Sequence, residues 1–389
     1  MAYPSTPREI EDGLGALAAA HPQLCTRSVS PNATHDGRRV SYVRVASSSG
    51  GEGRTPVLFI GGAHAREWVP PDALLTLLSR LLDAYEAGDD LLVPAFTDTA
   101  ATPDIAYPAT SIAAADVKRI VERVELFVLA LVNPDGRAFS QSSPANAMWR
   151  KNRRAPEPGS QCRGVDPNRN YDIAWDLERY YNRSGEAAVA ATTDPCDPQT
   201  YIGPSAASEP EVRNVARLLI DQQIEYFVDA HSFSRKLLYP WGMDHNQSRD
   251  RSQNFANPQW DDRRDGAPGG AYGEYIPAAA IDRHVRVGDA MHDAIVSAAG
   301  SDRRARVRSD YVVEPGLALY PTTGTASDYA YGVAIEDGEP LREVVSFTLE
   351  CGSDADGEGG FQPVPAIYPK IEREVHLALL ALLTEVAGD

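Results

Sequence analysis

Short apolar runs alternate along the chain with longer segments in which apolar positions recur with the period of a helix. Short runs rich in β-branched and aromatic residues are typical of strands, and the longer period is typical of amphipathic helices. The predicted strands are 41–45, 57–60, 124–132, 224–228 and 344–349, and the predicted helices are 71–86, 209–222, 276–299 and 369–386. Several strands have no polar face, as expected of central strands covered on both sides. The alternation therefore predicts an α/β fold in which helices cover a β-sheet.

Capping residues mark the start of two helices. Thr6 precedes Pro7 and Glu9, which predicts a capping box and a helix that begins at Pro7. Ser208 and Glu211 have the same spacing, so we predict a second capping box at the start of the helix over 209–222.

Two segments interrupt the alternation of strands and helices. Residues 87–115 are rich in Ala, Thr, Asp and Pro, and residues 244–273 are polar and contain a Gly-Ala-Pro-Gly-Gly run. We interpret both as surface insertions, either tolerated loops or lids, because no flexible linker joins two separately patterned halves. Residues 1–389 are therefore expected to form a single domain.

The charge of the chain limits its partners. It has 37 basic and 55 acidic residues, for a formal net charge of −18 at pH 7. Binding to nucleic acid requires clustered Lys and Arg that neutralise phosphates, and an anionic membrane surface also attracts basic segments. No apolar stretch reaches the roughly 18 residues that a membrane span needs. We therefore predict neither a nucleic acid nor a membrane as partner.

Histidines follow the ends of two predicted strands. The strand over 57–60 leads through two glycines to His64 and Glu67, and the strand over 224–228 leads to His231. Ligands bind beyond the carboxyl ends of strands in open α/β sheets, and a His and a Glu at this spacing can supply two ligands of a zinc site. The pattern is loose, because a loop histidine is more often solvated than bound to a metal. From these residues alone both interpretations stay open.

Six motifs in a fixed order extend this observation over most of the chain. They are HAREW (64–68), NPDG (133–136), WRK (149–151), GVDPNRN (164–170), DAHSFS with LYPWG (229–234 and 238–242) and SFTLE (346–350). In this order they resemble the zinc metallocarboxypeptidases of the carboxypeptidase A/B type. The resemblance covers residues 7–386 and implies one domain with a central twisted mixed β-sheet flanked by helices.

The resemblance also implies a metal site. His64, Glu67 and His231 match the ligands of one Zn²⁺ per chain, which is the ligand set of carboxypeptidase A and leaves a fourth position open for water. Asp166 matches a carboxylate that orients the first of these histidines, a contact that zinc-bound imidazoles commonly make.

Two further residues match groups that act on the peptide bond in the family. Glu350 matches the general base that takes a proton from water and passes it to the leaving amine. Arg150 matches the cation that stabilises the oxyanion of the tetrahedral intermediate. A carboxylate at a strand end is by itself more often a surface group than a catalyst.

Four residues match the family's contacts with substrate. Arg169 and Asn168 match the clamp on the C-terminal carboxylate, which suits the planar guanidinium. Tyr320 matches a mobile tyrosine that closes over the bound terminus. Arg66 matches a contact one residue upstream, and a salt bridge near the metal is the alternative for it.

Specificity is expected to depend on Ser327, which matches the floor of the side-chain pocket. An acidic residue there would select Lys or Arg, and an aliphatic one would favour apolar side chains. Because serine is neutral and small, and Thr322, Thr325 and Thr348 are its expected neighbours, we predict a preference for neutral or aromatic C-terminal residues. The adjacent Asp328 need not face this pocket.

The compartment is left open by conflicting features. Cys162 and Cys196 match a disulfide of the family, whereas Cys25 and Cys351 fit no such pair, and Cys351 is interpreted as a buried packing residue. A disulfide favours an extracellular location, which applies if the chain was trimmed. The first residues lack the pattern of a signal peptide, which favours the cytoplasm for the chain as given.

Two other functions are alternatives to a carboxypeptidase that acts, as a monomer, on peptide or protein C-termini. An amidase or deacylase of acylated amino acids could share the fold, but Arg169 and Tyr320 match residues that bind a free peptide C-terminus and make this less favoured. A non-catalytic binding protein would be expected to lose Glu350 or a zinc ligand, and none of these residues is missing from the sequence.

Overall fold

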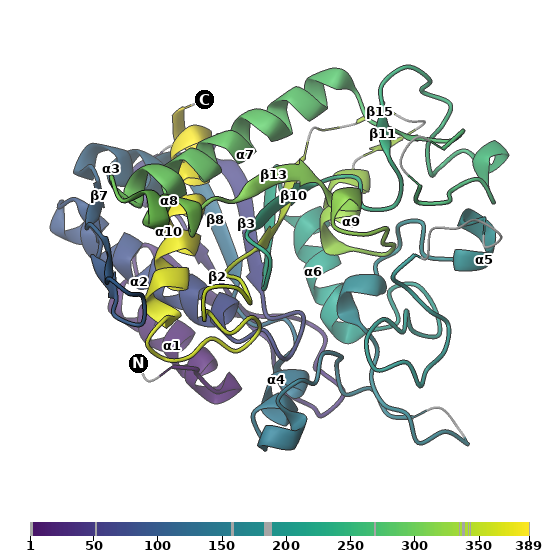
Figure 1. The fold of residues 1–389 in the computed structure, drawn as a ribbon, viewed down its shortest axis with the longest axis horizontal. Helices are drawn as coiled ribbons and strands as arrows, with labels where there is room; N and C mark the ends of the chain where they lie inside the picture. The colour runs from purple at the N-terminus through teal and green to yellow at the C-terminus, as the bar shows by residue number, and fades with distance from the viewer. Residues whose placement is uncertain are drawn as a thin grey trace.

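A mixed β-sheet forms the centre of the fold in the computed structural model, which describes residues 3–50, 53–156, 159–182, 189–267, 270–333, 335–336, 339–340, 342 and 344–388 (Figure 1). Within these residues the sheet has eight strands in the order β1-β2-β8-β3-β9-β16-β10-β13. The four central strands, β8, β3, β9 and β16, are parallel to their neighbours within that group. The strands are β1 Cys25–Val29, β2 Ser41–Val45, β3 Thr55–Gly61, β8 Val124–Leu129, β9 Tyr226–His231, β10 Lys236–Tyr239, β13 Val312–Pro315 and β16 Val345–Glu350.

Helices cover both faces of this sheet (Figure 1). Successive side chains of a strand point to opposite faces, so Val57 and Phe59 of β3 pack into one core and Leu58 and Ile60 into another. The first core is covered by α1 Pro7–Ala20, α2 Val69–Ala87, α3 Ala114–Arg123, α7 Ala278–Ala298 and α10 Tyr368–Gly388. The second is covered by α6 Pro210–Asp221 and α9 Ala326–Gly332. The predicted α/β class, with a central mixed sheet between helices, is confirmed.

The helix starts agree with the sequence in one case and differ in the other. Thr6 caps α1 as predicted, with its hydroxyl accepting from the Glu9 amide and its own amide donating to the Glu9 carboxylate. The capping box predicted for Ser208 and Glu211 is wrong, because Glu209 occupies the N-cap position of α6 without a side-chain capping bond and the helix begins at Pro210. The Glu211 carboxylate instead turns inward and accepts a hydrogen bond of 3.1 Å from Asn152.

The two interrupting segments contain short strands of their own. In the first, β4 Leu91–Val93 pairs with β7 Thr110–Ile112, and β5 Phe96–Asp98 pairs with β6 Ile105–Tyr107. In the second, β11 Asn246–Gln247 pairs with β12 Glu274–Tyr275. Arg264 and Glu274 form a buried ion pair of 2.8 Å within this second part of the chain. Their interpretation as insertions on a single domain stays a prediction.

Short elements complete the described chain. The helices are α4 Pro134–Ser140, α5 Leu177–Tyr180 and α8 Arg303–Val307, the 3-10 turns are Ser48–Gly50, Pro144–Asn146, Pro167–Arg169, Pro258–Trp260 and Gly316–Ala318, and β14 Ile335–Glu336 pairs with β15 Glu339–Pro340. Among the described residues, no helix has the length and apolarity needed to cross a membrane.

Candidate active site

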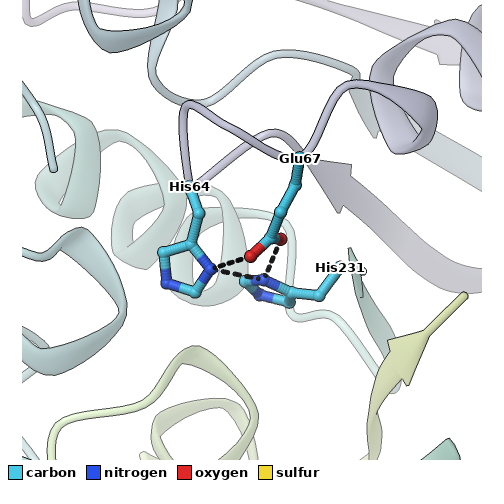
Figure 2. A group of neighbouring side chains, drawn as sticks. All are labelled: His64, Glu67 and His231. Atoms are coloured by element: carbon cyan, nitrogen blue, oxygen red, sulfur yellow. Dashed lines mark hydrogen bonds and ion pairs between the residues drawn. The ribbon is translucent and has the colours of Figure 1, made fainter. Parts of the chain in front are cut away.

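Three side chains meet beyond the carboxyl ends of β3 and β9. Figure 2 shows both imidazole rings and the carboxylate turned toward one another, with His64 Nδ1 2.7 Å from Glu67 Oε1 and His231 Nδ1 2.9 Å from Glu67 Oε2. The two Nδ1 atoms are 3.0 Å apart. All three residues are buried.

The backbone brings these residues together through the parallel pairing of β3 with β9. Gly61, the last residue of β3, lies opposite Ala230, so the turn that carries His64 follows beside His231. Gly62 makes this turn possible, because its φ is +66° and a Cβ there would lie 2.7 Å from Leu131 Cδ1. A residue with a side chain would be strained and crowded at this position.

The donor set fits a metal cation. Two imidazole nitrogens and a carboxylate oxygen that could act as ligands all lie within 4.8 Å of one another. Lone pairs on three atoms so close together repel one another unless a cation or protons lie between them. Two His and one Glu form the ligand set of catalytic zinc sites in several hydrolases, which leave a fourth position open.

Asp166 connects this cluster to an arginine. Its Oδ1 lies 3.2 Å from His64 Nε2, and its Oδ2 accepts hydrogen bonds from Arg150 Nε at 3.0 Å and from Nη2 at 2.9 Å. Asp166 is completely buried. Although burial raises its pKa, the charges of Arg150 and His64 hold the pKa well below its ordinary value. Asp166 is therefore a fixed anion that orients both residues.

A second carboxylate approaches the cluster from β16. Glu350 is the last residue of this strand and lies opposite His231 in the parallel register. Burial raises the pKa of Glu350 to about 7, with Glu67 adding to the shift and His231 and Arg150 opposing it. A cation bound nearby would lower this pKa, because positive charge favours the carboxylate. Glu350 thus lies beside the cluster, at a position where its pKa depends on whether a cation is bound.

A single cavity joins these groups to most of the other predicted site residues. Arg66, Asn168, Arg169, Tyr320 and Ser327 line it together with His64, Glu67, Arg150 and Glu350. His231 and Asp166 are not among the lining residues and contact the lining from behind.

A family model described as "Zinc carboxypeptidase" matches residues 10–376. The chain belongs to the zinc carboxypeptidase family. Carboxypeptidase A1 of Sus scrofa is 32% identical over 238 residues, which cover 61% of this chain and 46% of that protein. Carboxypeptidase B of Helicoverpa zea is 25% identical over 370 residues, which cover 94% of this chain and 66% of that protein. The matched part thus spans about half the length of the pig enzyme.

Solved structures support the same fold. The crystal structure of carboxypeptidase A from Helicoverpa armigera superposes with a TM-score of 0.68 at 20% identity, covering 99% of this chain and 74% of that one. Bovine thrombin-activatable fibrinolysis inhibitor, in complex with tick carboxypeptidase inhibitor, gives a TM-score of 0.67 at 19% identity and covers 99% and 97%. The zinc carboxypeptidase fold therefore accounts for almost the whole chain.

Within this zinc carboxypeptidase fold, Arg169 is held by backbone carbonyls. Its Nε donates to the Ala190 carbonyl at 2.6 Å and its Nη1 donates to the Asn168 carbonyl at 2.5 Å. Its guanidinium carbon lies 6.0 Å from the centre of the Tyr320 ring, and Tyr320 itself is 39% exposed. The guanidinium of Arg169 is therefore fixed in place, whereas the nearby Tyr320 ring is partly exposed.

Arg66 has partners that the sequence did not indicate. Its Nη1 donates to Gln199 Oε1 at 2.8 Å, and its guanidinium lies 3.9 Å from the centre of the Phe361 ring. Burial and the nearby Arg150 lower the pKa of Arg66. Gln199 and Phe361 lie far from Arg66 in sequence and in none of the six motifs, so no local signal could have identified them.

The region around Ser327 is lined by hydroxyl groups. Thr348 Oγ1 donates to Ser327 Oγ at 3.0 Å, and Thr322 and Thr325 also line the cavity. Asp328 lines it too, although the sequence did not require this. Its carboxylate accepts from the Gly242 amide at 3.0 and 3.1 Å, and burial raises its pKa to about 7.

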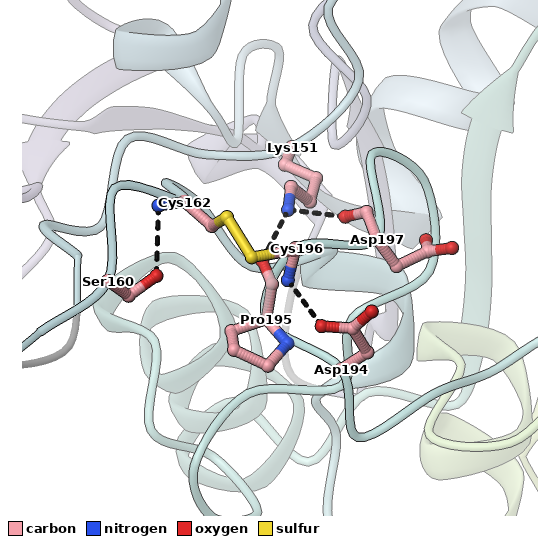
Figure 3. The surroundings of a disulfide bond; sticks show 7 residues. All are labelled: Lys151, Ser160, Cys162, Asp194, Pro195, Cys196 and Asp197. Carbon is pink, nitrogen blue, oxygen red and sulfur yellow. Dashed lines mark hydrogen bonds between the residues drawn. A yellow bond between two sulfur atoms is a disulfide. The ribbon is translucent and has the colours of Figure 1, made fainter.

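A disulfide braces the loop next to this site. Cys162 and Cys196 are bonded, as predicted (Figure 3). Lys151, the neighbour of Arg150, donates to the carbonyl of Asp197 at 2.6 Å, and the same loop continues to Gln199. The disulfide therefore stabilises the segment that contacts Arg66.

Titration of thiols tests this disulfide. In denaturant, the chain is expected to show free thiols from Cys25 and Cys351 only, which are buried and unpaired in the folded protein. Reduction should raise the count to the full 4 cysteines and lower the stability by about 2–4 kcal/mol, because the bond closes a long loop. Four free thiols before reduction would contradict the disulfide.

Proposed function

We propose that the chain is a zinc-dependent exopeptidase that hydrolyses the C-terminal peptide bond of peptides and proteins. The observation that carries this proposal is the cavity that joins the metal-ligand cluster, the Glu350 carboxylate and the buried guanidinium of Arg169. A metallohydrolase needs the first two, and recognition of a free C-terminus needs the third. We also propose one Zn²⁺ per chain, held by His64, Glu67 and His231.

Each residue has a chemical role in this proposal. Bound zinc supplies a Lewis acid that polarises the scissile carbonyl and acidifies water. Glu350 accepts the proton of the attacking water at its carboxylate and donates it to the leaving nitrogen. Arg150, oriented by Asp166, stabilises the negative charge that develops on the carbonyl oxygen.

The substrate terminus binds in the same cavity. Arg169 and Asn168 bind its carboxylate, and Tyr320, at the exposed rim, closes over it. Arg66 contacts the residue upstream of the scissile bond. These assignments set the register of the substrate, so that only the last peptide bond reaches Glu350.

The side chain of the terminal residue enters the region around Ser327. The hydroxyl groups of Ser327 and Thr348 offer neither a fixed charge nor a purely apolar surface. Asp328 is engaged by the Gly242 amide, and its raised pKa reduces its charge at neutral pH. Neutral or aromatic C-terminal residues are therefore preferred, although the relatives include both carboxypeptidase A and carboxypeptidase B.

Replacing Ser327 by Asp tests this preference. The Ser327→Asp variant is expected to raise kcat/KM for a C-terminal Arg relative to Phe by at least about tenfold, which corresponds to roughly 1.4 kcal/mol from one buried charge pair. Ser327→Asn adds similar volume without charge and is expected to leave the ratio nearly unchanged. An unchanged ratio in Ser327→Asp would contradict the placement of the pocket.

The proposed function is tested with N-blocked dipeptides that end in Phe, Leu, Lys, Arg or Glu. Release of the free terminal amino acid is expected to be fastest for Phe and Leu. A chelator should abolish release, and added zinc should restore it. No chelator-sensitive release from any of the five substrates would overturn the proposal.

A further inference from the structure

The second histidine of the metal cluster has a carboxylate behind it, Asp229, to which the resemblance assigns no role. Asp229 precedes His231 by two residues on β9, so both side chains emerge on the same face of the strand. Asp229 Oδ2 lies 2.7 Å from His231 Nε2, and Asp229 is 1% exposed. Among the described residues, no aligned hydrogen-bond donor reaches either Asp229 oxygen.

Burying such a carboxylate costs folding free energy, which suggests that it has a functional role. Burial of an ionised group without hydrogen-bond donors is unfavourable, so packing alone does not explain an aspartate at this position. The only close polar contact that the structure gives Asp229 is the ring of His231. We therefore expect Asp229 to act on the His231 imidazole.

A neighbouring amide acts on the same nitrogen in the opposite direction. The Ala326 amide donates to Asn168 Oδ1 at 2.7 Å, which fixes the Asn168 side chain so that Nδ2 lies 3.2 Å from His231 Nε2. An amide NH₂ can only donate, so Asn168 favours the tautomer with an unprotonated Nε2. That tautomer carries its proton on Nδ1, the atom that faces Glu67 and His64.

A proton on Nδ1 would prevent that nitrogen from binding a metal, so the tautomer decides whether the cluster works. The negative charge of Asp229, 2.7 Å from Nε2, favours a proton on that nitrogen, and the attraction of a full charge at this distance outweighs the effect of a neutral amide. We propose that Asp229 is a positioning residue that holds His231 in the tautomer and orientation needed to bind zinc. Each histidine of the cluster then has its own buried carboxylate, Asp166 for His64 and Asp229 for His231.

The test is the zinc affinity of Asp229→Asn, measured by competition with a chromogenic chelator. The variant is expected to raise the zinc dissociation constant by roughly 10–100-fold, the range found for partners of metal-bound histidines. Its metal-free Tm should change little, because the gain from replacing a buried carboxylate by a neutral amide offsets the lost attraction to the His231 ring. Asp229→Ser, measured in parallel, should show the same pair of changes.

Asp328→Asn is the matched control. Asp328 is another buried carboxylate of this region but contacts the Gly242 amide rather than a histidine, so its replacement should leave the zinc affinity unchanged. Wild-type zinc affinity in Asp229→Asn would overturn the proposal. A large fall of the metal-free Tm, or failure of both Asp229 variants to fold, would also overturn it and make Asp229 a structural residue.

This inference rests on the metal site of the proposed function, but the two fail differently. If the unmodified chain bound no zinc, the proposed function would fail. If the unmodified chain and Asp229→Asn bound zinc equally well, only the role of Asp229 would fail.

Discussion

The Glu350→Gln variant is expected to lose roughly 10²–10⁴-fold in kcat, the contribution typical of a general acid–base group. Glutamine has nearly the same shape as glutamate, but its amide cannot accept the proton of water at neutral pH. Glu350 lies at the end of β16 beside His231, and we expect it to act as a base rather than as a metal ligand. Zinc content and Tm should therefore stay close to those of the unmodified chain.

Three measurements distinguish whether Glu350 acts as a general base or as a metal ligand. The kcat is measured under saturating substrate, the zinc content by elemental analysis and the Tm by calorimetry. Glu385→Gln, near the end of α10 and outside the cavity, is the control and should keep full activity. Loss of zinc together with activity would show that Glu350 binds the metal, and undiminished kcat would remove it from the mechanism.

The Arg169→Gln variant is expected to lose kcat/KM toward substrates with a free C-terminus by roughly 30- to 4,000-fold. Loss of one partner of a buried charge pair costs about 2–5 kcal/mol, and each 1.4 kcal/mol corresponds to about tenfold. Arg169 is 2% exposed and is fixed by two carbonyls, so a terminal carboxylate would bind to it away from water. A substrate with a C-terminal amide should lose little, because it never makes this ion pair.

Arg66→Gln is the matched control, since Arg66 is the other guanidinium at the cavity with a proposed substrate contact. It should lower the rates toward the free acid and the amide by the same factor and so preserve their ratio. If Arg169→Gln also preserved that ratio, the carboxylate clamp would be assigned to the wrong residue. Tm values of both variants exclude a general loss of structure.

Apolar patterning predicted the sheet because its central strands are covered on both faces. β3 contains the apolar run 57–60 and β9 is buried along its whole length, and parallel pairing places their carboxyl ends side by side. The order of the motifs was enough to assign the family. The structure places Glu350 next to His231, because both residues end neighbouring parallel strands.

Contacts between distant side chains could not be predicted in this way. The inward turn of Glu211 depends on Asn152, and the position of Arg66 depends on Gln199, which the disulfide loop brings near. Asp229 lies within a motif, yet only its distance to His231 Nε2 distinguishes it from an ordinary strand residue. Side-chain direction at these positions is set by tertiary packing, which periodicity does not describe.

The most direct test of the account compares an N-blocked dipeptide ending in Phe with the same dipeptide carrying a C-terminal amide, each with and without a chelator. The zinc-loaded chain is expected to release Phe from the free acid much faster than phenylalaninamide from the amide, and the chelator should stop both reactions. Equal rates for the two substrates, or hydrolysis that survives the chelator, would contradict a zinc-dependent exopeptidase that recognises the C-terminal carboxylate.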